Sequence, residues 1–530
     1  MLESTALLYS EIRRKVLDSL EITGIRGTND VLPAARTAQL ETEARLRDLL
    51  SLYGYRPVDT PVLEPTDLFL RKAGEQIAAR MYSFTHWNRS ICLRPEHTAS
   101  VIRAYVNHLQ DRPLPVRLQY SGPTFRYEKP QRGRHRQFTE VGVECIGASG
   151  PAADAEILAL ARHGLELLGV PGIHIVVGHL GAVLEFLAQL GMEPRSQSLV
   201  VGVMEHLSRT PEDVDRVVER LARMLGAGTQ GDGTEDPLTD LFQSFGYGGA
   251  ARIAGDLLER ANLQLDGGSR SPEEIVERLL LKSRRVDPTP ALRRAVEFIG
   301  RLRDVAGTPG EALPALHDVL DEYGLDDGPV LEVEQALEGF SGYFQDGCSV
   351  RVDLSMARGL RYYTGLVFEI YDDQNVQLAG GGRYDDLVRA LGGRASVPAV
   401  GFSYGLERVL AALDRGASAN DTAAHVPVLL VPVDGADVGA ATRLATELRS
   451  AGIGVEVDVR LRGLKANLRH ADRETIPLVL IVGEKERDEG VVLLRDMRAR
   501  EEVRVAQHEV PAAVSTRLAS VVAGEPVGRS

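Results

Sequence analysis

Two alternating segments on either side of a basic loop constrain the fold of this chain more than any other feature. Residues 115–128, PVRLQYSGPTFRYE, and residues 136–147, RQFTEVGVECIG, alternate polar with apolar side chains and are rich in β-forming residues. This pattern predicts two strands, and the polar run KPQRGRH between them predicts a hairpin with a long flexible loop. We therefore expect an antiparallel sheet in at least one domain.

A chain of 530 residues is expected to form roughly two to four domains, and the pattern of apolar and polar residues changes several times along this sequence. Residues 36–53 have helical spacing, and the proline-broken segment 55–65 suits an edge strand. Near the end, a β-α-β-α-β order predicts an α/β domain with a largely parallel sheet. The fold class is α+β, and the expected parts are a helical extension (1–20), an α+β domain in two pieces (21–175 and 346–414), a mainly helical insertion (176–345), a polar linker (415–425) and the α/β domain (426–520).

Charge and composition exclude several classes of protein. The chain has 61 Lys and Arg against 75 Asp and Glu, so it does not resemble a protein that coats nucleic acid non-specifically, although a local basic groove is compatible with this balance. No run of about 18 uncharged apolar residues occurs, so we expect no membrane span. The three cysteines form no CxxC pair, which argues against a disulfide framework or a Cys-rich zinc site and fits a reducing cytoplasm.

Basic side chains crowd into the predicted hairpin. They are Arg126, Lys129, Arg132, Arg134, His135 and Arg136. Arginine presents a planar fork of donors that suits phosphate oxygens, and a flexible basic loop suits a polyanion. On the return strand, alternation places Phe138, Glu140 and Glu144 on one face, which offers an aromatic ring and two carboxylates. A hairpin that only exposes its charges to solvent fits the same pattern.

The segment LRPEHTAS, residues 93–100, has the pattern of a strand that enters a helix. Pro95 would fix the turn, and Thr98 can cap the helix. Glu96 would then lie where a cationic group can dock. A purely structural cap fits this short motif as well.

The segment ARGLRYYTGLVFEIY, residues 357–371, combines a bend with two tyrosines. The glycine after Arg358 permits a tight bend there. If Tyr362 and Tyr363 lie on a strand, they point to opposite faces, so only one of them can line a pocket.

Two further segments carry weaker signals. Residues 379–386, AGGGRYDD, superficially resemble a phosphate loop but lack the spacing of a Walker or Rossmann motif. Residues 396–410 predict a strand that leads into a helix, with Arg408 on its first turns, where a surface role is the commoner one. The 12 histidines form no HExxH or i,i+4 pair, so we expect no metal held by protein residues.

Taken in order, these segments resemble one family, the histidyl-tRNA synthetases, which are class II aminoacyl-tRNA synthetases. GIRGTNDVLP resembles the family's opening motif, TPVLEP resembles the end of class II motif 1, FRYEKPQRGRHRQF resembles motif 2, and GFSYGLERVL resembles motif 3. RGLRYYTGLVFE resembles the histidine-specific signature RGLDYY, and the tail from LKANLRHADRE onward resembles the anticodon-binding domain. The resemblance covers residues 24–175 and 347–518. It implies an antiparallel catalytic sheet with helices, a helical insertion and a C-terminal α/β anticodon-binding domain.

The resemblance also implies a reaction and its catalytic residues. Histidine would be activated by ATP, accompanied by Mg²⁺, and then attached to histidine tRNA. Arg126 would bind the α-phosphate of ATP, and Arg358 would reach it from the other side, where it stands in for a metal. Glu128 and Phe138 would belong to the ATP site, with Phe138 stacked on adenine. Arg408 would hold the γ-phosphate.

The resemblance assigns the remaining positions to histidine, tRNA and assembly. Glu96 and Thr98 would bind the ammonium group of histidine, and Glu144 with Tyr362 or Tyr363 would bind its imidazole. The residues implied in histidine binding are Glu96, Thr98, Glu140, Glu144, Tyr362 and Tyr363; those implied in tRNA binding are Gln131, Arg134, Arg462 and Lys465. The family further implies a homodimer. Cysteine usage and the lack of a long apolar run predict a cytoplasmic location and no membrane partner.

Three positions depart from the family's pattern. His97 replaces the Gly of RPEGT, Glu140 stands where Gln is usual, and Arg361 replaces the Asp of RGLDYY. His97 adds bulk beside the substrate, and Glu140 adds negative charge near the adenylate. These departures bear on rate or specificity rather than on fold.

A second function fits part of the sequence. Residues 138–161 and 173–191 also resemble the regulatory subunit of ATP phosphoribosyltransferase, a synthetase-like paralogue that does not charge tRNA. That subunit lacks an anticodon-binding domain, which residues 426–518 would supply here. It also tends to lose the arginines that this chain keeps as Arg126 and Arg408.

Overall fold

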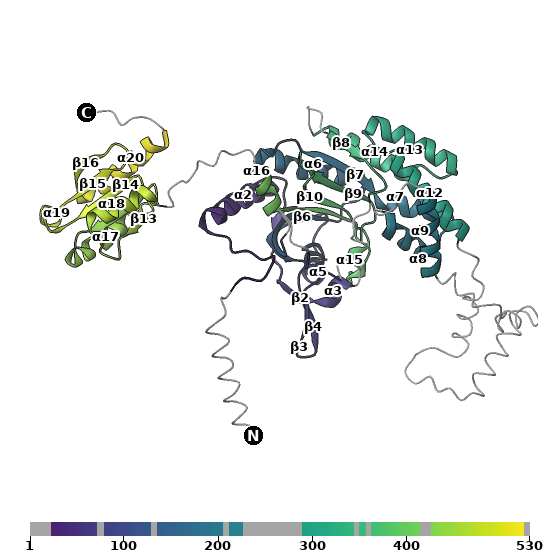
Figure 1. Cartoon of the computed structure of the whole chain (residues 1–530), viewed down its shortest axis with the longest axis horizontal. Helices are drawn as coiled ribbons and strands as arrows, with labels where there is room; N and C mark the ends of the chain where they lie inside the picture. The colour runs from purple at the N-terminus through teal and green to yellow at the C-terminus, as the bar shows by residue number, and fades with distance from the viewer. Residues whose placement is uncertain are drawn as a thin grey trace, which may run out of the picture. The chain divides into compact units, whose positions relative to one another are not determined.

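The computed structural model forms two compact units, Met1–Ala417 and Ser418–Ser530 (Figure 1). The expected N-terminal helix at 1–20 and the expected linker at 415–425 lie outside the residues that the structure describes. The described residues are 23–70, 79–128, 135–204, 211–225, 289–343, 349–356, 362–413 and 426–523.

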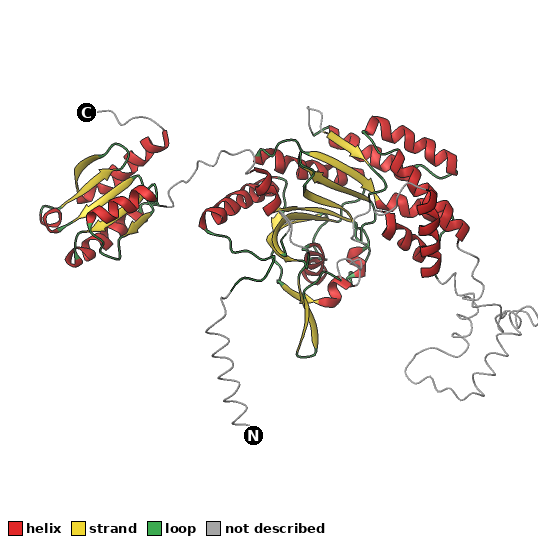
Figure 2. Ribbon diagram, viewed as in Figure 1, coloured by secondary structure: helices red, strands yellow, loops and turns green. Residues whose placement is uncertain are grey.

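An eight-stranded sheet organises the first unit (Figure 2). The predicted hairpin is confirmed, because β5 and β6 pair antiparallel from Val116↔Ile146 to Phe125↔Gln137. Antiparallel pairing continues from β6 through β11, β10 and β9 to β7, and only the outer pairs β1–β5 and β7–β8 are parallel. In spatial order the strands are β1 (Arg56–Pro57), β5 (Val116–Phe125), β6 (Gln137–Ile146), β11 (Ala399–Gly405), β10 (Gln377–Arg383), β9 (Leu366–Tyr371), β7 (His174–His179) and β8 (Ser349–Val352).

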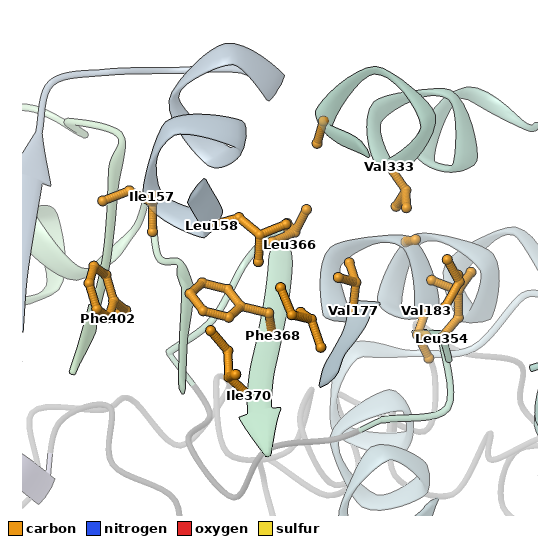
Figure 3. Close-up of a cluster of buried hydrophobic side chains, with 14 of the residues drawn as sticks. Ile157, Leu158, Val177, Val183, Val333, Leu354, Leu366, Phe368, Ile370 and Phe402 are labelled. Carbon is orange, nitrogen blue, oxygen red and sulfur yellow. The ribbon is translucent and has the colours of Figure 1, made fainter. Parts of the chain in front are cut away.

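Apolar side chains on one face of this sheet pack against long helices. Figure 3 shows Ile157 and Leu158 of α6 near Phe368 of β9 and Phe402 of β11, and all four side chains are buried. Complete burial of such side chains stabilises the fold by about 1.5–3 kcal/mol each. The helices of the α+β part are α2 (Pro33–Leu52), α5 (Thr98–His108), α6 (Pro151–Leu168), α15 (Leu387–Ala390) and α16 (Leu406–Leu413).

Strand β6 divides its side chains between two cores. Val141, Val143 and Cys145 belong to the core under α2 and α6. The opposite face carries Glu140 and Glu144, as the sequence alternation predicts, and faces a second apolar cluster that contains residues of α5 and α15.

A small three-stranded sheet precedes α5. It has the order β2-β4-β3, with β2 (Leu63–Pro65), β4 (Arg89–Leu93) and β3 (Ser83–His86), and α3 (Thr66–Leu70) follows β2. Strand β4 leads directly into the turn that begins α5, which agrees with the strand-to-helix pattern of residues 93–100.

The middle of the chain is mainly helical where it is described. Strand β7 still belongs to the large sheet, so the helices begin at Leu180 rather than at residue 176. The predicted loop at 226–237 lies outside the described residues. The helices are α7 (Leu180–Gln189), α8 (Pro194–Val203), α9 (Pro211–Met224), α12 (Thr289–Asp304), α13 (Pro309–Tyr323) and α14 (Gly328–Ser341).

The second unit has the predicted β-α-β-α-β order and a largely parallel sheet. Strands β13, β12 and β14 are parallel, and an antiparallel pair, β15 and β16, extends the sheet beyond them. The elements in chain order are β12 (Val428–Pro432), α17 (Val438–Ser450), β13 (Val455–Val457), α18 (Leu464–Arg473), β14 (Leu478–Val482), α19 (Glu484–Asp488), β15 (Val491–Asp496), β16 (Glu501–Ala506) and α20 (Val510–Ala523). None of the helices that the structure describes is long and apolar enough to cross a membrane.

Candidate active site

Glycines make the floor of the candidate site. A Cβ added to Gly142 of β6 would lie 2.6 Å from the Tyr120 hydroxyl, and a Cβ added to Gly401 of β11 would overlap the Glu144 carboxylate. Only glycine leaves room at these two positions for polar side chains to lie directly on the sheet.

Glu144 is the deepest acid of the site and is fully buried. Its Oε1 accepts from the Tyr120 hydroxyl at 3.3 Å, and its Oε2 accepts from the Tyr384 hydroxyl. Burial raises the pKa of Glu144 to about 8, although hydrogen bonds from Tyr384, Thr98 and Tyr120 favour ionisation. A ligand that brings a proton donor or a positive charge would therefore stabilise the carboxylate form.

Glu96 is a second buried acid and caps the N-terminus of α5. Its Oε1 accepts from the Ala99 backbone amide at 3.0 Å, so the expectation that Thr98 caps this helix is wrong: Thr98 is the first helical residue, and Glu96 supplies the acceptor. Within the described parts of the chain, Oε2 of Glu96 has no hydrogen-bond partner. Burial and the neighbouring charge of Glu140 raise the pKa of Glu96 to about 7.

Glu140 is the third buried acid and is held from two sides. Arg126 donates to its Oε1 at 3.0 Å, and His97 Nδ1 lies 3.3 Å from its Oε2. Burial alone would raise the pKa of Glu140, but the hydrogen bond from His97 and the charge of Arg126 bring it below its ordinary value. Glu140 is therefore the ionised member of the three acids.

Tyr362 and Tyr363 do not lie on a strand, contrary to the interpretation from the sequence. Tyr362 and Tyr363 precede β9 rather than lying in it, so the expectation that they point to opposite faces is wrong. Both are buried in the same apolar cluster, with ring centroids 4.9 Å apart, and Tyr384 completes the group at 5.7 Å from Tyr362. The charge of Glu96 adds to burial in raising the pKa of Tyr362.

Tyr384 is a site residue that the sequence analysis missed. It follows β10, a glycine-rich central strand whose sequence resembles a phosphate loop only superficially. A Cβ at Gly382 would lie 3.0 Å from the Tyr363 ring, so the glycine run permits close packing. A single tyrosine immediately after a glycine-rich strand was the only signal for this position.

The neighbouring arginine braces this strand. Arg383 Nε donates to Asp154 of α6 at 2.9 Å, and its other nitrogens donate to the backbone oxygens of Ala148 and Gly150 at 2.9 and 3.2 Å. These contacts anchor the end of β10 and so fix the residue that follows it, Tyr384.

A second group of predicted residues lies around the start of β6. The Arg126 guanidinium lies 5.2 Å from the ring centre of the half-buried Phe138, and Glu128 pairs with Arg80 at 3.3 Å. The carboxylate of Glu407, on the first turn of α16, accepts from the Thr139 amide at 2.9 Å.

This contact brings the start of α16 to β6. Arg408, the next residue of α16, donates to the Gln377 backbone oxygen at 3.1 Å. The structure thus brings Phe138, Glu140 and Glu144 of β6 together with Arg126, which follows β5, and with Arg408 on the adjoining helix. Arg358, Arg361, Gln131 and Arg134 lie outside the described residues.

Comparisons with known proteins agree with this geometry. A family model described as histidyl-tRNA synthetase matches residues 27–252 and 278–409, and one described as anticodon binding domain matches residues 427–517. The chain belongs to the histidyl-tRNA synthetase family. A histidine--tRNA ligase of Methanocaldococcus jannaschii is 31% identical over 476 residues, 89% of this chain and 94% of the relative. One of Desulforudis audaxviator is 33% identical over 498 residues, which cover 92% of this chain and 96% of the relative.

A solved structure shares the fold. The crystal structure of histidyl-tRNA synthetase from Nostoc sp. PCC 7120 matches with a TM-score of 0.61 and 18% identity, and covers 94% of this chain and 100% of that chain. The class II synthetase fold predicted from the sequence, with its antiparallel sheet and C-terminal α/β domain, is therefore confirmed.

The anticodon-binding unit of this family member presents basic side chains near the start of α18. Lys465 is exposed, whereas Arg462 is half-buried and donates to Asp458 at 2.9 Å. Hydrogen bonds from Asn467 and Arg462 outweigh burial and lower the pKa of Asp458. Arg460 and Arg469 are exposed nearby in the sequence. Lys465 is thus open to a ligand, and Arg462 is tied to the loop before the helix.

The described residues contain no group of three or more His, Cys, Asp or Glu side chains with the geometry of a metal site. Two of the three cysteines, Cys92 and Cys145, are free and buried. Cys348 lies outside the described residues.

Proposed function

We propose that this protein attaches histidine to histidine tRNA in two steps, through a histidyl-adenylate that forms from histidine and ATP. The observation that carries the proposal is the set of three buried acids, Glu96, Glu140 and Glu144, on the catalytic sheet of a chain that belongs to this family. Two of the three have a raised pKa because burial disfavours their ionised form, so a ligand that brings positive charge would stabilise these two acids as carboxylates. A histidine molecule supplies this charge through its ammonium group and its imidazole ring.

The ammonium group and the imidazole ring of histidine would bind different acids. The ammonium group has three N–H donors. It suits the ionised Glu140 and the Oε2 of Glu96, which has no hydrogen-bond partner among the residues that the structure describes, with Thr98 beside them. The imidazole suits Glu144 and the hydroxyls of Tyr120 and Tyr384, because its two nitrogens need one acceptor and one donor or two acceptors. Hydrogen bonding of this kind can reject a side chain that lacks the nitrogens by about 10⁴–10⁵-fold.

The expected roles of the remaining histidine and ATP residues stay proposals. Tyr362 or Tyr363 would close the imidazole pocket, and Phe138 would stack on adenine. Glu128 would contribute to the ATP site, and Arg408 would hold the γ-phosphate. Mg²⁺ would enter with ATP as part of the substrate.

Adenylation requires charge to be stabilised at the α-phosphate. The carboxylate of histidine attacks phosphorus, and pyrophosphate leaves from the opposite side. Arg126, fixed by Glu140 and by the Pro95 carbonyl at 2.7 Å, would lie against the α-phosphate oxygens, with Arg358 on the other side. Fixed cations stabilise the developing charge without reorganisation, and holding the two reactants together supplies much of the remaining rate.

The tRNA would contact both units. Gln131 and Arg134 of the hairpin loop would reach its acceptor end, and Arg462 and Lys465 would meet its anticodon region, where basic side chains neutralise phosphates.

Several properties of the whole protein also stay proposals. We propose that residues 21–175 and 346–414 form the catalytic domain, that 176–345 form an insertion, and that 426–520 form the anticodon-binding domain. The family resemblance supports a homodimer, and the cysteine usage fits a cytoplasmic location.

Pyrophosphate exchange tests the proposed function. The wild-type protein should convert labelled pyrophosphate into ATP only when histidine is present, and should then charge histidine tRNA. Exchange without charging would leave an amino-acid-activating enzyme that is not a synthetase. Absence of both would favour the alternative, a regulatory subunit of ATP phosphoribosyltransferase.

A further inference from the structure

His97 lies beside the buried acids Glu96 and Glu140, and the proposed reaction gives it no role. Its side chain is buried, with 1% of the residue exposed, and it directly follows Glu96 at the start of α5. Its ring stacks on that of Tyr120, with centroids 4.5 Å apart and planes 11° from parallel. Stacking and burial together fix the plane of the ring.

One nitrogen of this ring contacts Glu140. Nδ1 of His97 lies 3.3 Å from Oε2, while Arg126 donates to Oε1 at 3.0 Å. The two partners bind opposite oxygens and so determine the orientation of the carboxylate. A carboxylate oxygen accepts about two hydrogen bonds, so each oxygen retains capacity for a ligand.

The neighbours of the ring determine where its proton lies. Burial lowers the pKa of His97, and the positive charge of Arg94 acts in the same direction, against the attraction of Glu140 and Asp59. Arg94 is itself buried, so its charge is weakly screened. A neutral ring beside an ionised carboxylate carries its proton on Nδ1, and His97 therefore acts as a donor to Glu140.

We propose that His97 is a positioning residue, which orients the Glu140 carboxylate toward the α-ammonium group of the substrate. Glu96 approaches the same region, since its charge and that of Glu140 interact, and its Oε2 has no partner in the described parts of the chain. An ammonium group between the two acids is thereby held by one carboxylate fixed at a helix N-terminus and one fixed by His97. This inference rests on the proposed function, because it takes histidine as the ligand.

A matched pair of ligands isolates the ammonium contact. L-Histidinol carries the ammonium group and the imidazole, and 3-(imidazol-4-yl)propan-1-ol differs from it only by lacking the amino group. Neither has a carboxylate, so neither reacts with ATP. Calorimetry on the full-length protein gives their affinities.

Two variants separate the donor from the ring. His97→Phe keeps a flat ring on Tyr120 and removes the donor, and His97→Asn keeps a donor near Nδ1 and loses the stacked ring. We expect His97→Phe to weaken histidinol binding about tenfold, as expected for a lost hydrogen bond to a charged group, and to leave the amine-free alcohol within about twofold. His97→Asn should bind histidinol within about threefold of wild type. Equal losses for the two ligands in His97→Phe, or a loss in His97→Asn as large as in His97→Phe, would overturn the proposal.

A measurement on the wild-type protein does not depend on folding of the variants. Nitrogen-15 NMR of histidine-labelled protein should show a neutral His97 ring with its proton on Nδ1. A protonated ring, or a proton on Nε2, would overturn the positioning role.

Failure of the positioning role and failure of the proposed function are distinguishable. If wild-type protein binds histidinol but exchanges no pyrophosphate, the proposed function is refuted. The role of His97 can still be tested, because it is measured by the histidinol affinity of the variants. Active wild-type protein whose histidinol affinity is unchanged by His97→Phe refutes only the role of His97. Wild-type protein that binds neither ligand refutes both.

Discussion

Charged side chains gather both in the site on the large sheet and at the start of α18. They are buried in the first place and exposed to solvent in the second. Glu96, Glu140 and Glu144 are removed from water and perturb one another, so two of them have a strongly raised pKa. Lys465, by contrast, lies in solvent at the start of α18. Water and salt screen exposed charges but hardly affect buried ones. Single changes in the pocket should therefore have large and specific effects, and single changes on α18 should have small and additive ones.

The largest effect is expected for Glu144→Gln. This change keeps the shape of the side chain but removes the charge that would bind imidazole, so the KM for histidine should rise roughly 10–100-fold in pyrophosphate exchange. The KM for ATP should stay within about twofold. Glu166→Gln, a change in a partly exposed glutamate that pairs with Arg162, serves as the control. If both KM values rise together in Glu144→Gln, the residue supports the fold rather than the ligand.

Removal of the second unit should reduce tRNA binding and leave adenylation at least partly intact, because the two activities depend on different sites. A chain that ends after Leu413 keeps every described pocket residue and should retain pyrophosphate exchange at least in part. Its affinity for tRNA should fall more than about tenfold, with a weaker salt dependence, because several phosphate contacts are lost. Filter binding at several salt concentrations measures both quantities. Unchanged tRNA affinity would contradict the anticodon-binding role and favour the regulatory function.

The raised pKa values of the pocket predict a dependence on pH. Glu144, with a pKa near 8, and Glu96, with a pKa near 7, hold protons in the folded chain that the unfolded chain releases around pH 4.5. Their contribution to the free energy of unfolding is therefore complete below about pH 4.5 and is lost as the pH rises through 7 to 8. A cationic ligand must displace these protons, so histidinol should bind about tenfold more tightly at pH 8 than at pH 7.

Calorimetry can detect the displaced protons directly. The apparent binding enthalpy should vary between buffers of different ionisation enthalpy, and Glu144→Gln should reduce this variation. A buffer-independent enthalpy for the wild-type protein would mean that the acids are already ionised in the empty pocket.

The smallest effect is expected for Lys465→Ala. Loss of one exposed phosphate contact should weaken tRNA binding about two- to threefold and reduce the slope of log affinity against log salt by about 1. Lys485→Ala, which changes an exposed lysine on α19, is the matched control. Equal effects of the two changes would indicate a general attraction to RNA rather than a site on α18.

Local periodicity explains which parts of the fold could be predicted from the sequence. Strands β5 and β6 and the face that carries Glu140 and Glu144 follow from alternation within one hairpin. Strand β10 was missed because its glycines leave no alternation to detect. Tyr362 and Tyr363 were misplaced because the turn before β9 lies next to residues with good strand propensity.

The details of the candidate site depend on contacts between distant residues. His97 meets Glu140 across 43 positions, and Tyr384 meets Glu144 across 240. No local pattern specifies such pairs. The resemblance to a family assigns roles to Glu96, Glu140 and Glu144, and it marks His97 and Glu140 as departures from the family's motifs. The structure brings these two departures into contact.

The two glycines beneath the site, Gly142 and Gly401, limit which mutations it can accept. Gly142 and Gly401 have no space for even one methyl group, so mutations there would displace Tyr120 or Glu144 instead of reshaping the cavity. A change of amino-acid specificity would have to begin at side chains outside the strands, such as Tyr362, which precedes β9, and Tyr384, which follows β10. The most variable parts of such a site among its descendants should thus be the segments just before β9 and just after β10.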